Sequence, residues 1–459
     1  MSEPEVPADE HARGRRRRVL IVTYYWPPSG GSGVQRWLKL AKYLPASGWE
    51  PVIVAPADAD YELTDETLGD DVDDGLEVLR YPIREPYALY RRLTGDTGRK
   101  APTARDASGA RPGALRRIAM WARANLFVPD PKVWWVGPTV KRLGAYLAAH
   151  PVDAIVTTGP PHSIHLIGRA LKRAHPGLAW LVDIRDPWSQ FDVHLAFGPG
   201  RRAREKNRRL ERACLAEADR VVATSYSMPD HLEPFERAKF RTVTNGYDAA
   251  DFERDTAASP YAPTASASGA GPYVVLHAGL LTASRNPSGL WRALADYCAA
   301  DAGFAGRLEL HLIGSVEEVV LDEVRSYGAL ASRLRHEPWV SHAEIVTRYA
   351  SADLLLLCPN RSDNARGQIN GKLFEYLAAG KPILHIGPFD SDNTRILDHT
   401  HAGITVPPGD ADGALDALRR LYDGRFAASP HALRPGASAP YTRSATARQL
   451  AKVLDELVG

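Results

Sequence analysis

The chain has few cysteines, no long hydrophobic run and almost no net charge. Its three cysteines, Cys214, Cys298 and Cys358, are far apart in the sequence, which excludes a disulfide scaffold and a cysteine-rich metal site. No apolar run approaches the roughly 18–20 residues of a membrane span, and no apolar signal segment precedes the first apolar strand. The net charge of +2 argues against a nucleic-acid-binding protein. We therefore expect a cytoplasmic protein.

The sequence also lacks the short motifs of several enzyme classes. Neither G-x-S-x-G nor G-x-x-x-x-G-K-[ST] occurs, which argues against an α/β-hydrolase and a P-loop nucleotidase. Gly31-x-Gly33 lacks the third glycine of a dinucleotide-binding turn. His162 and His165 are three residues apart, but no carboxylate or further histidine is placed to complete a metal site with them. We expect neither a cofactor nor a metal.

Short apolar runs alternate with helical patterns along most of the 459 residues. Residues 18–24 and 49–55 are typical of strands buried on both faces, and a helical pattern separates them, which predicts a parallel sheet. A segment rich in Ala, Ser, Pro and Gly interrupts this alternation before a second series begins. The predicted organisation is a disordered tail (1–17), a first α/β domain (18–254), a linker (255–272), a second α/β domain (273–440) and a C-terminal helix (441–459).

Two loops of the second half have the composition of an anion site. Ligands of open parallel sheets bind at the carboxyl ends of the strands, where helices begin and their first N–H groups are unpaired. Gly279 follows the strand at 273–277, and Arg285 precedes a helix that starts near Pro287. Asn370-Gly371-Lys372 opens another helix, with Glu375 one turn further on. A lysine in a first helical turn opposes the helix dipole, and a bound phosphate would relieve this conflict.

Three loops of the first half end strands in the same way. Gly30 and Gly31 follow the first strand and fit either a flexible turn or close approach of a sugar or phosphate. His162 lies between the end of a strand and the start of a helix, a position that fits either a structural or a catalytic histidine. Asp186 follows the strand at 180–184 and fits either a turn residue or a catalytic carboxylate, while Asp183 and Arg185 could pair with each other.

Four segments together resemble a known family over nearly the whole chain. They are Tyr24–Gly33, Asn245-Gly246-Tyr247-Asp248, His277–Leu280 with Arg285, and Lys372–Pro382 with its Lys-Leu-Phe-Glu-Tyr-Leu stretch. The last is the most specific. With these segments the chain resembles the retaining glycosyltransferases of the GT-B fold, family 4. The resemblance implies two Rossmann-like, doubly wound domains facing across a cleft. It also implies a C-terminal helix that returns to the first domain through its apolar stripe of Leu450, Val453, Leu454 and Leu457.

The resemblance further implies an activity. A glycosyltransferase (EC 2.4, hexosyltransferase type) would move a sugar from a nucleotide-sugar to a glycan or lipid-linked acceptor, with retention and without a metal, in cell-envelope polysaccharide biosynthesis. Its Glu375 would bind the donor ribose and its Arg285, standing where the family has a lysine, the pyrophosphate. The family's other glutamate is Gly367 here and an arginine is Leu280, so Asn370 and Lys372 would take over their contacts.

The predicted site therefore draws on both domains. We predict catalytic residues His162, Asp186 and Arg285, and donor-binding residues Gly30, Gly31, Gly279, Arg285, Asn370, Gly371, Lys372 and Glu375. Two alternatives stay open: a nucleotide-sugar epimerase or hydrolase of the same fold, and a non-catalytic nucleotide-sugar-binding protein.

Basic residues are concentrated in the first domain. Between Arg84 and Arg142 there are thirteen basic and four acidic residues, interleaved with aromatic residues such as Trp121 and Trp134. This combination fits an anionic membrane surface. A solvated, partly disordered insertion is the other interpretation. From the first interpretation we predict peripheral binding to the inner face of the membrane.

Overall fold

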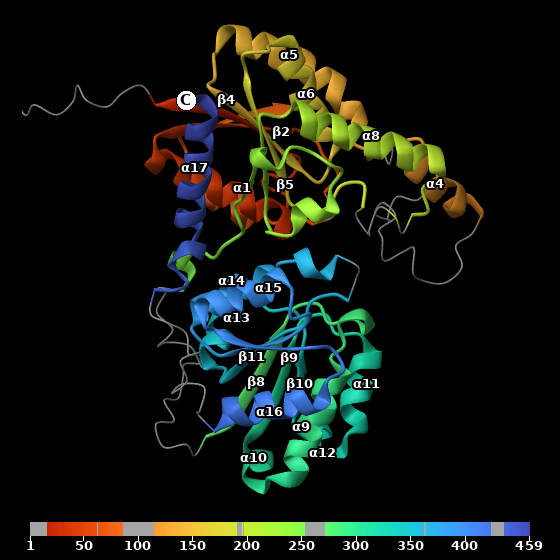
Figure 1. The fold of residues 1–459 in the computed structure, drawn as a ribbon, viewed down its shortest axis with the longest axis vertical. Coiled ribbons are helices and arrows are strands. Elements are labelled where there is room, and N and C mark those ends of the chain that lie inside the picture. The colour runs from red at the N-terminus through yellow and green to blue at the C-terminus, as the bar shows by residue number, and fades with distance from the viewer. Residues whose placement is uncertain are drawn as a thin grey trace, which may run out of the picture. The chain divides into compact units, whose positions relative to one another are not determined.

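The computed structural model describes residues 16–61, 63–85, 114–190, 195, 197–252, 271–361, 364–423 and 436–459. The chain divides into two compact units. Unit 1 comprises Met1–Thr224, Met228–Val243 and Thr446–Gly459, and unit 2 comprises Ser225–Ser227 and Thr244–Ala445. Each unit is built around its own parallel sheet (Figure 1).

The sheet of unit 1 has seven strands in the order β3-β2-β1-β4-β5-β6-β7. Every pair is parallel; Ile21, for example, pairs with Ile53 on one side and Val156 on the other. The chain first builds outward from β1 through β2 to β3 and then returns to the other side of β1, so the strand order reverses between β1 and β4. The strands are β1 (Arg17–Val22), β2 (Trp49–Pro56), β3 (Glu77–Tyr81), β4 (Ala154–Gly159), β5 (Ala179–Ile184), β6 (Arg220–Ala223) and β7 (Phe240–Thr242).

Helices cover both faces of this sheet, which is why its strands are continuously apolar. Val19 and Ile21 belong to a core with α1 (Ser32–Tyr43) and α17 (Arg443–Val458). Leu20 and Val22 belong to the opposite core. The helices α5 (Val136–Ala149), α6 (Ser163–Ala174) and α8 (Arg201–Glu217) contribute to that second core, and α4 (Ala114–Asn125) lies against α8.

The C-terminal helix packs on the sheet of unit 1 through its apolar stripe, as the family resemblance implied. Leu450, Val453 and Leu454 of α17 are buried in the core that contains Val19. Asp455 anchors the far end of the helix, because it accepts hydrogen bonds from Arg17 Nη1 at 2.9 Å and Trp49 Nε1 at 3.0 Å. In Figure 1 this helix runs beside α1.

The sheet of unit 2 has six parallel strands in the order β10-β9-β8-β11-β12-β13, and its order reverses between β8 and β11. The strands are β8 (Tyr273–Ala278), β9 (Leu308–Ile313), β10 (Leu334–Glu337), β11 (Leu354–Leu357), β12 (Ile383–Ile386) and β13 (Gly403–Val406). One face is covered by α9 (Ser288–Ala300), α10 (Ala302–Arg307), α11 (Glu318–Ser326), α12 (Gly328–Ala331) and α16 (Ala411–Tyr422). The other is covered by α13 (His342–Ser351), α14 (Gly371–Ala379) and α15 (Asp392–Thr400).

The boundary between the units differs from the sequence-based one. The chain passes from unit 1 to unit 2 at Val243 and Thr244, not at 254, so the Asn245–Asp248 segment belongs to unit 2. There Tyr247 exchanges backbone hydrogen bonds with Tyr441 and Arg443, which a local pattern cannot show. Arg17, which was predicted to end the tail at 1–17, is the first residue of β1. The first 15 residues of that tail lie outside the described part of the chain. Most of the predicted linker, 253–270, lies outside it as well.

Candidate functional site

Two glycine turns shape the carboxyl edge of the unit 2 sheet. Gly279 follows β8 with φ of 119°, and Gly314 follows β9 with φ of 117°, a region that favours glycine. The Gly279 N–H donates to the Ile313 carbonyl at 2.7 Å. A Cβ on Gly314 would lie 2.5 Å from the Gly279 carbonyl oxygen, and a Cβ on Gly279 would lie 3.8 Å from Lys372 Cε. The turns therefore pack backbone to backbone, and the lysine stem lies over Gly279.

Lys372, Glu375 and Tyr349 form a hydrogen-bonded cluster beside this turn. Lys372 Nζ donates to the Tyr349 hydroxyl at 2.9 Å and to Glu375 Oε2 at 3.1 Å, and the Tyr349 hydroxyl donates to the same oxygen at 2.9 Å. Burial raises the pKa of Tyr349 well above its usual value, and the Glu375 carboxylate raises it further, so the phenol keeps its proton. Among the described residues Glu375 Oε1 has no hydrogen-bond partner, which leaves one carboxylate oxygen for a ligand hydroxyl.

The amino end of α14 supplies the second half of this arrangement. Asn370 is the N-cap residue, without a side-chain capping hydrogen bond, and Gly371 and Lys372 form the first turn. The Asn370 N–H donates to Asn393 Oδ1 at 3.3 Å, and Asn393 Nδ2 donates to the Gln368 carbonyl at 2.9 Å. Asn393 thus fixes the loop that leads into the helix. The N–H groups of the first turn stay oriented along the helix axis, as anion sites require.

Arg285 brings a second cation to the same turn. It ends a short 3₁₀ helix (Ala283–Arg285), and its Nη1 donates weakly to the Leu280 carbonyl at 3.4 Å. Buried His277, on β8, lies close to both cations. Burial lowers the pKa of His277 to about 4, a hydrogen bond to the Leu356 carbonyl opposes this, and the charges of Arg285 and Lys372 lower it further. His277 is therefore neutral at pH 7, and Arg285 and Lys372 are the cations around Gly279.

The predicted residues of unit 1 also lie at a carboxyl edge. His162 is buried as the N-cap residue of α6, and its ring stacks on Trp188 with centroids 5.0 Å apart and planes 7° from parallel. Asp130, which the sequence did not suggest, occupies the amino end of α6: its carboxylate accepts from the Ser163 N–H and Oγ, each at 2.8 Å. That helix end is therefore capped from within the protein.

Arg185 and Asp183 do not pair with each other, which corrects one sequence-based alternative. Fully buried Asp183 accepts from Arg36 Nη2, Trp37 Nε1 and Thr158 Oγ1, each at 2.8 Å. Burial alone would raise the pKa of Asp183, but the Arg36 cation outweighs it and the pKa is lowered. Arg36 and Asp183 therefore form a buried structural ion pair.

Arg185 instead joins three loops at the carboxyl edge. Its guanidinium donates to the carbonyls of Gly33 at 2.6 Å, Gly159 at 3.4 Å and Pro160. Next to it lies half-buried Asp186. Burial raises the pKa of its carboxyl group, and the Arg185 cation lowers it by a smaller amount. Asp186 is thus held beside a fixed positive charge, at the strand end where the sequence predicted a functional carboxylate.

Gly30 and Gly31 shape the loop between β1 and α1. The Gly30 N–H donates to the Leu63 carbonyl at 2.8 Å, and Gly31 is the N-cap residue of α1. The predicted residues thus fall into two groups. Gly30, Gly31, His162 and Asp186 lie in unit 1, whereas Gly279, Arg285, Asn370, Gly371, Lys372 and Glu375 lie in unit 2 and gather around one turn.

Three further residues of the unit 2 site, Tyr349, Asn393 and His342, carry no local signal in the sequence. His342 begins α13, and its pKa is raised mainly by a hydrogen bond to Asp251 at 3.3 Å, with the Glu375 carboxylate adding to the shift against burial. All three lie within helices, His342 and Tyr349 in α13 and Asn393 in α15, without a local motif. Only the fold places them beside Lys372 and Glu375.

Comparisons with known proteins agree with this architecture. Residues 30–246 match the family model of the glycosyl transferase 4-like domain, and residues 271–424 match that of the glycosyl transferases group 1. The chain therefore carries both domains of a GT-B glycosyltransferase. Among curated proteins no sequence relative matches this glycosyltransferase.

Solved structures show the same fold over nearly the whole enzyme. Sucrose-phosphate synthase from Thermosynechococcus elongatus is 17% identical, with a TM-score of 0.59 over 96% of this chain and 99% of that one. The Anabaena protein HepE, solved with UDP and glucose, is 14% identical, with a TM-score of 0.56 over 96% and 100%. An α,α-trehalose-phosphate synthase from Burkholderia xenovorans, solved with glucose-6-phosphate, is 12% identical, with a TM-score of 0.59 over 96% and 99%.

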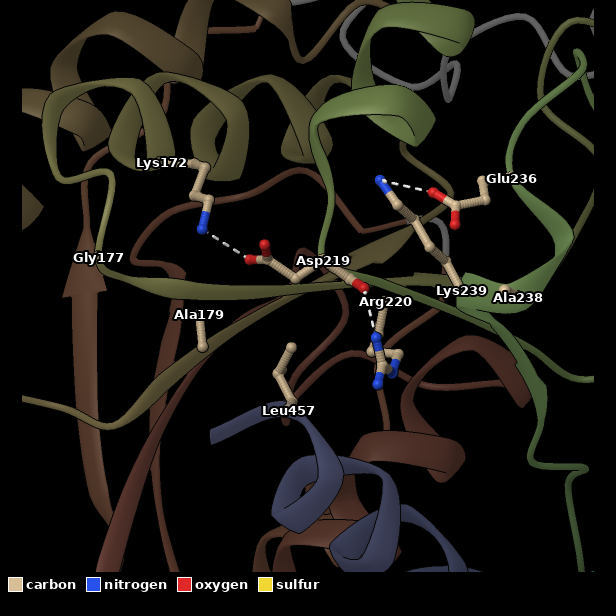
Figure 2. A pocket seen from close by; sticks show the side chains of 9 residues that line it. All are labelled: Lys172, Gly177, Ala179, Asp219, Arg220, Glu236, Ala238, Lys239 and Leu457. Atoms are coloured by element: carbon tan, nitrogen blue, oxygen red, sulfur yellow. Dashed lines mark hydrogen bonds and ion pairs between the residues drawn. The ribbon is translucent and has the colours of Figure 1, made fainter. Parts of the chain in front are cut away.

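A cavity of about 550 Å³ lies at the opposite edge of the glycosyltransferase's first sheet, where β5 and β6 begin (Figure 2). Its charged side chains largely pair within the protein: Lys172 contacts Asp219 at 2.8 Å, and Lys239 Nζ donates to the Ala216 and Ala218 carbonyls at 2.9 and 3.0 Å. No predicted site residue lines it. We therefore place the candidate site at the carboxyl edges and not in this cavity.

The described residues form neither a metal-binding cluster nor a membrane-spanning helix. In that part of the glycosyltransferase, no group of three or more His, Cys, Asp or Glu side chains is arranged to hold a metal ion. None of the helices described there combines the length and the apolar character that crossing a membrane requires.

Proposed function

We propose that the enzyme transfers a sugar from a nucleotide-sugar to an acceptor hydroxyl with retention at the anomeric carbon and without a metal. The observation that carries this proposal is the cluster of Lys372, Glu375 and Tyr349 beside the Gly279 turn and Arg285. It combines two cations, a helix amino end and a carboxylate with one open oxygen. The UDP and glucose in the HepE structure support the donor class.

Each group has a role toward the donor. Arg285, Lys372 and the first-turn N–H groups of α14 bind the pyrophosphate, and Gly279 lets it approach the backbone. Glu375 Oε1 accepts hydrogen bonds from the ribose hydroxyls. As the bond between the anomeric carbon and the phosphate oxygen breaks, negative charge grows on the pyrophosphate. The two cations therefore stabilise the transition state more than the ground state, and they supply the charge that a metal would otherwise provide.

The acceptor is a glycan or a lipid-linked precursor, and its hydroxyl loses a proton as it attacks. We assign the catalytic roles in unit 1 to His162 and Asp186. The raised pKa of Asp186 favours acceptance of a proton, and the stacking of His162 on Trp188 holds its ring in one orientation. The sugar-phosphate in the trehalose-phosphate synthase structure is an acceptor class to test beside glycans.

The decisive experiment measures transfer and hydrolysis of UDP- and GDP-sugars with candidate acceptors, with and without EDTA. Acceptor-dependent release of nucleoside diphosphate that survives EDTA, with the product anomer matching the donor, supports the proposal. Release without an acceptor would instead indicate a hydrolase. Donor binding with no turnover for any acceptor would indicate a binding protein.

A peripheral location on the inner membrane face also belongs to this proposal, with a role in cell-envelope polysaccharide synthesis. Side chains of α4 and the following loop project into solvent: Ile118 is 65% exposed, Trp121 57% and Leu126 61%. The neighbouring helix α8 adds exposed basic residues, and the Gly200 N–H that precedes it donates to Asn125 Oδ1 at 2.8 Å. The basic residues between 86 and 113 lie outside the described part of the chain.

Liposome co-sedimentation tests this location. Binding should require anionic lipid, weaken as salt rises, and fall when Ile118 and Trp121 are replaced by serine. Val319→Ser, at a 55% exposed apolar residue of unit 2, is the matched control. Equal sedimentation with neutral liposomes would contradict a peripheral, charge-dependent location.

A further inference from the structure

Three neighbouring loops line the carboxyl edge of unit 2 on one side of the pyrophosphate site. The Gly314 N–H donates to the Glu337 carbonyl at 2.9 Å, which ties the end of β9 to the end of β10. Gly314 in turn packs against Gly279. Because neighbouring strands lie about 4.8 Å apart, the loop after β10 starts about 10 Å from the Gly279 turn. A nucleoside attached to a pyrophosphate at Gly279 spans such a distance.

The loop after β10 presents an indole ring to solvent. Trp339 is 79% exposed, the highest value among the large hydrophobic side chains of the described residues. The backbone on its C-terminal side is anchored, since Val340 packs on the core and Ser341 Oγ caps α13 by accepting from the Glu344 N–H at 3.2 Å. An exposed ring on an anchored backbone offers a flat face at little entropic cost to a planar ligand.

Glu375 fixes the direction in which the nucleoside extends. Its carboxylate is held by Tyr349, which belongs to α13, the helix that begins directly after the Trp339 loop. A ribose bound at Glu375 therefore lies between α14 and α13, on the β10 side of the turn. Phe389 is another exposed aromatic residue of this edge, at 64%, but it follows β12, on the opposite side of β8 in the strand order.

We propose that Trp339 stacks on the nucleobase of the donor. This inference rests on the proposed nucleotide-sugar donor and adds the residue that binds the base. Stacking on an indole uses the flat face that every base has, so Trp339 contributes affinity for uridine and guanosine nucleotides alike. The choice between bases then depends on other contacts.

Binding of UDP, GDP and inorganic pyrophosphate to the full-length enzyme tests this assignment by calorimetry. Trp339→Ala should weaken UDP and GDP binding by roughly 5- to 150-fold, from the usual cost of losing one base–aromatic stack. It should leave pyrophosphate binding unchanged, because pyrophosphate has no base. Trp339→Phe should restore most of the affinity, and Phe389→Ala should have no effect.

Three outcomes would overturn the inference. Unchanged UDP and GDP binding by Trp339→Ala, with the wild-type enzyme binding both, overturns the stacking role alone. Equal weakening of pyrophosphate binding overturns it in favour of a structural role. If the wild-type enzyme binds neither UDP nor GDP, the proposed donor class fails, and the stacking role fails with it.

Discussion

At the scale of single residues, the two carboxylate oxygens of Glu375 have different surroundings. Oε2 is held by Lys372 and Tyr349, so it orients the side chain, whereas Oε1 faces no hydrogen-bond donor among the described residues. A carboxylate held in one orientation loses little conformational entropy when it binds a diol. The donor contact that we propose for Glu375 is therefore separable from its contribution to the local structure.

Glu375→Ala should lower transfer roughly ten- to a hundredfold, the usual effect of losing a charge-assisted hydrogen bond to a ligand. Glu375→Gln should retain the contact to Tyr349 but bind the ribose less tightly. Arg285→Ala should lower the rate to a similar extent, because it removes charge from the proposed pyrophosphate site. Steady-state kinetics with circular dichroism as a folding control measures this, and wild-type rates in both alanine variants would contradict the assigned roles.

The buried ion pair of Arg36 and Asp183 should contribute to the free energy of unfolding. Asp183→Ala leaves the Arg36 guanidinium, 2% exposed, without its counter-ion. Removing one partner of such a pair costs about 3–5 kcal/mol. Urea unfolding should show this loss, with Glu456→Ala, part of an exposed pair with Arg241, as the matched control. A loss no larger than that of the control would contradict a structural role for Asp183.

At the scale of elements, local sequence signals determine α14, whereas tertiary packing determines α17. Local sequence favours α14, which begins after Asn370 and ends at Gly380 in the left-handed region. The position of α17 depends on burial, because its apolar stripe completes a core formed by β1, β2 and α1. A short amphipathic helix has little stability of its own in water.

Leu454→Ala should therefore destabilise the protein by about 2–5 kcal/mol, since Leu454 is fully buried in this core. Leu457→Ala, at a partly buried position of the same helix, should cost less. Thermal and urea unfolding of both variants compares them directly. Equal effects would show that α17 does not depend on burial of its stripe.

At the scale of the whole molecule, three buried histidines make stability depend on pH. Burial lowers the pKa of His165 to about 3, that of His277 to about 4 and that of His385 to about 3, from a usual value of 6.5. Below pH 6.5 the unfolded chain binds protons that the folded chain does not. The free energy of unfolding therefore falls as pH decreases from 6.5 to about 4, by about 1.4 kcal/mol per pH unit for each histidine.

Calorimetric melting between pH 7.5 and 5 checks this expectation. His165 lies in unit 1 and the other two lie in unit 2, so unit 2 should lose stability more steeply wherever the two melt separately. His385→Gln, which removes one of the three, should flatten the slope of unit 2. A slope unchanged by this substitution would contradict the argument for His385.

Local pattern was enough to predict much of this protein. The buried strands at 18–24, 49–55, 153–158 and 273–277 follow from short apolar runs, and α14 with Lys372 and Glu375 follows from its start and stop signals. The short strands β3, β7, β10 and β13 went unpredicted, because edge strands with half-buried faces carry weak patterns.

The sequence by itself determined the two α/β series, the glycine turns and the residues that open α14, because each depends on neighbours within one or two helical turns. Only the tertiary structure decided that Asp183 pairs with Arg36, 147 residues away, that Asp130 caps α6, and that Tyr349 holds Glu375. These contacts join segments that come together only when parallel strands align their carboxyl ends. A pattern read along the chain contains the residue types for such contacts but not their partners, since pairing is set by strand order and burial.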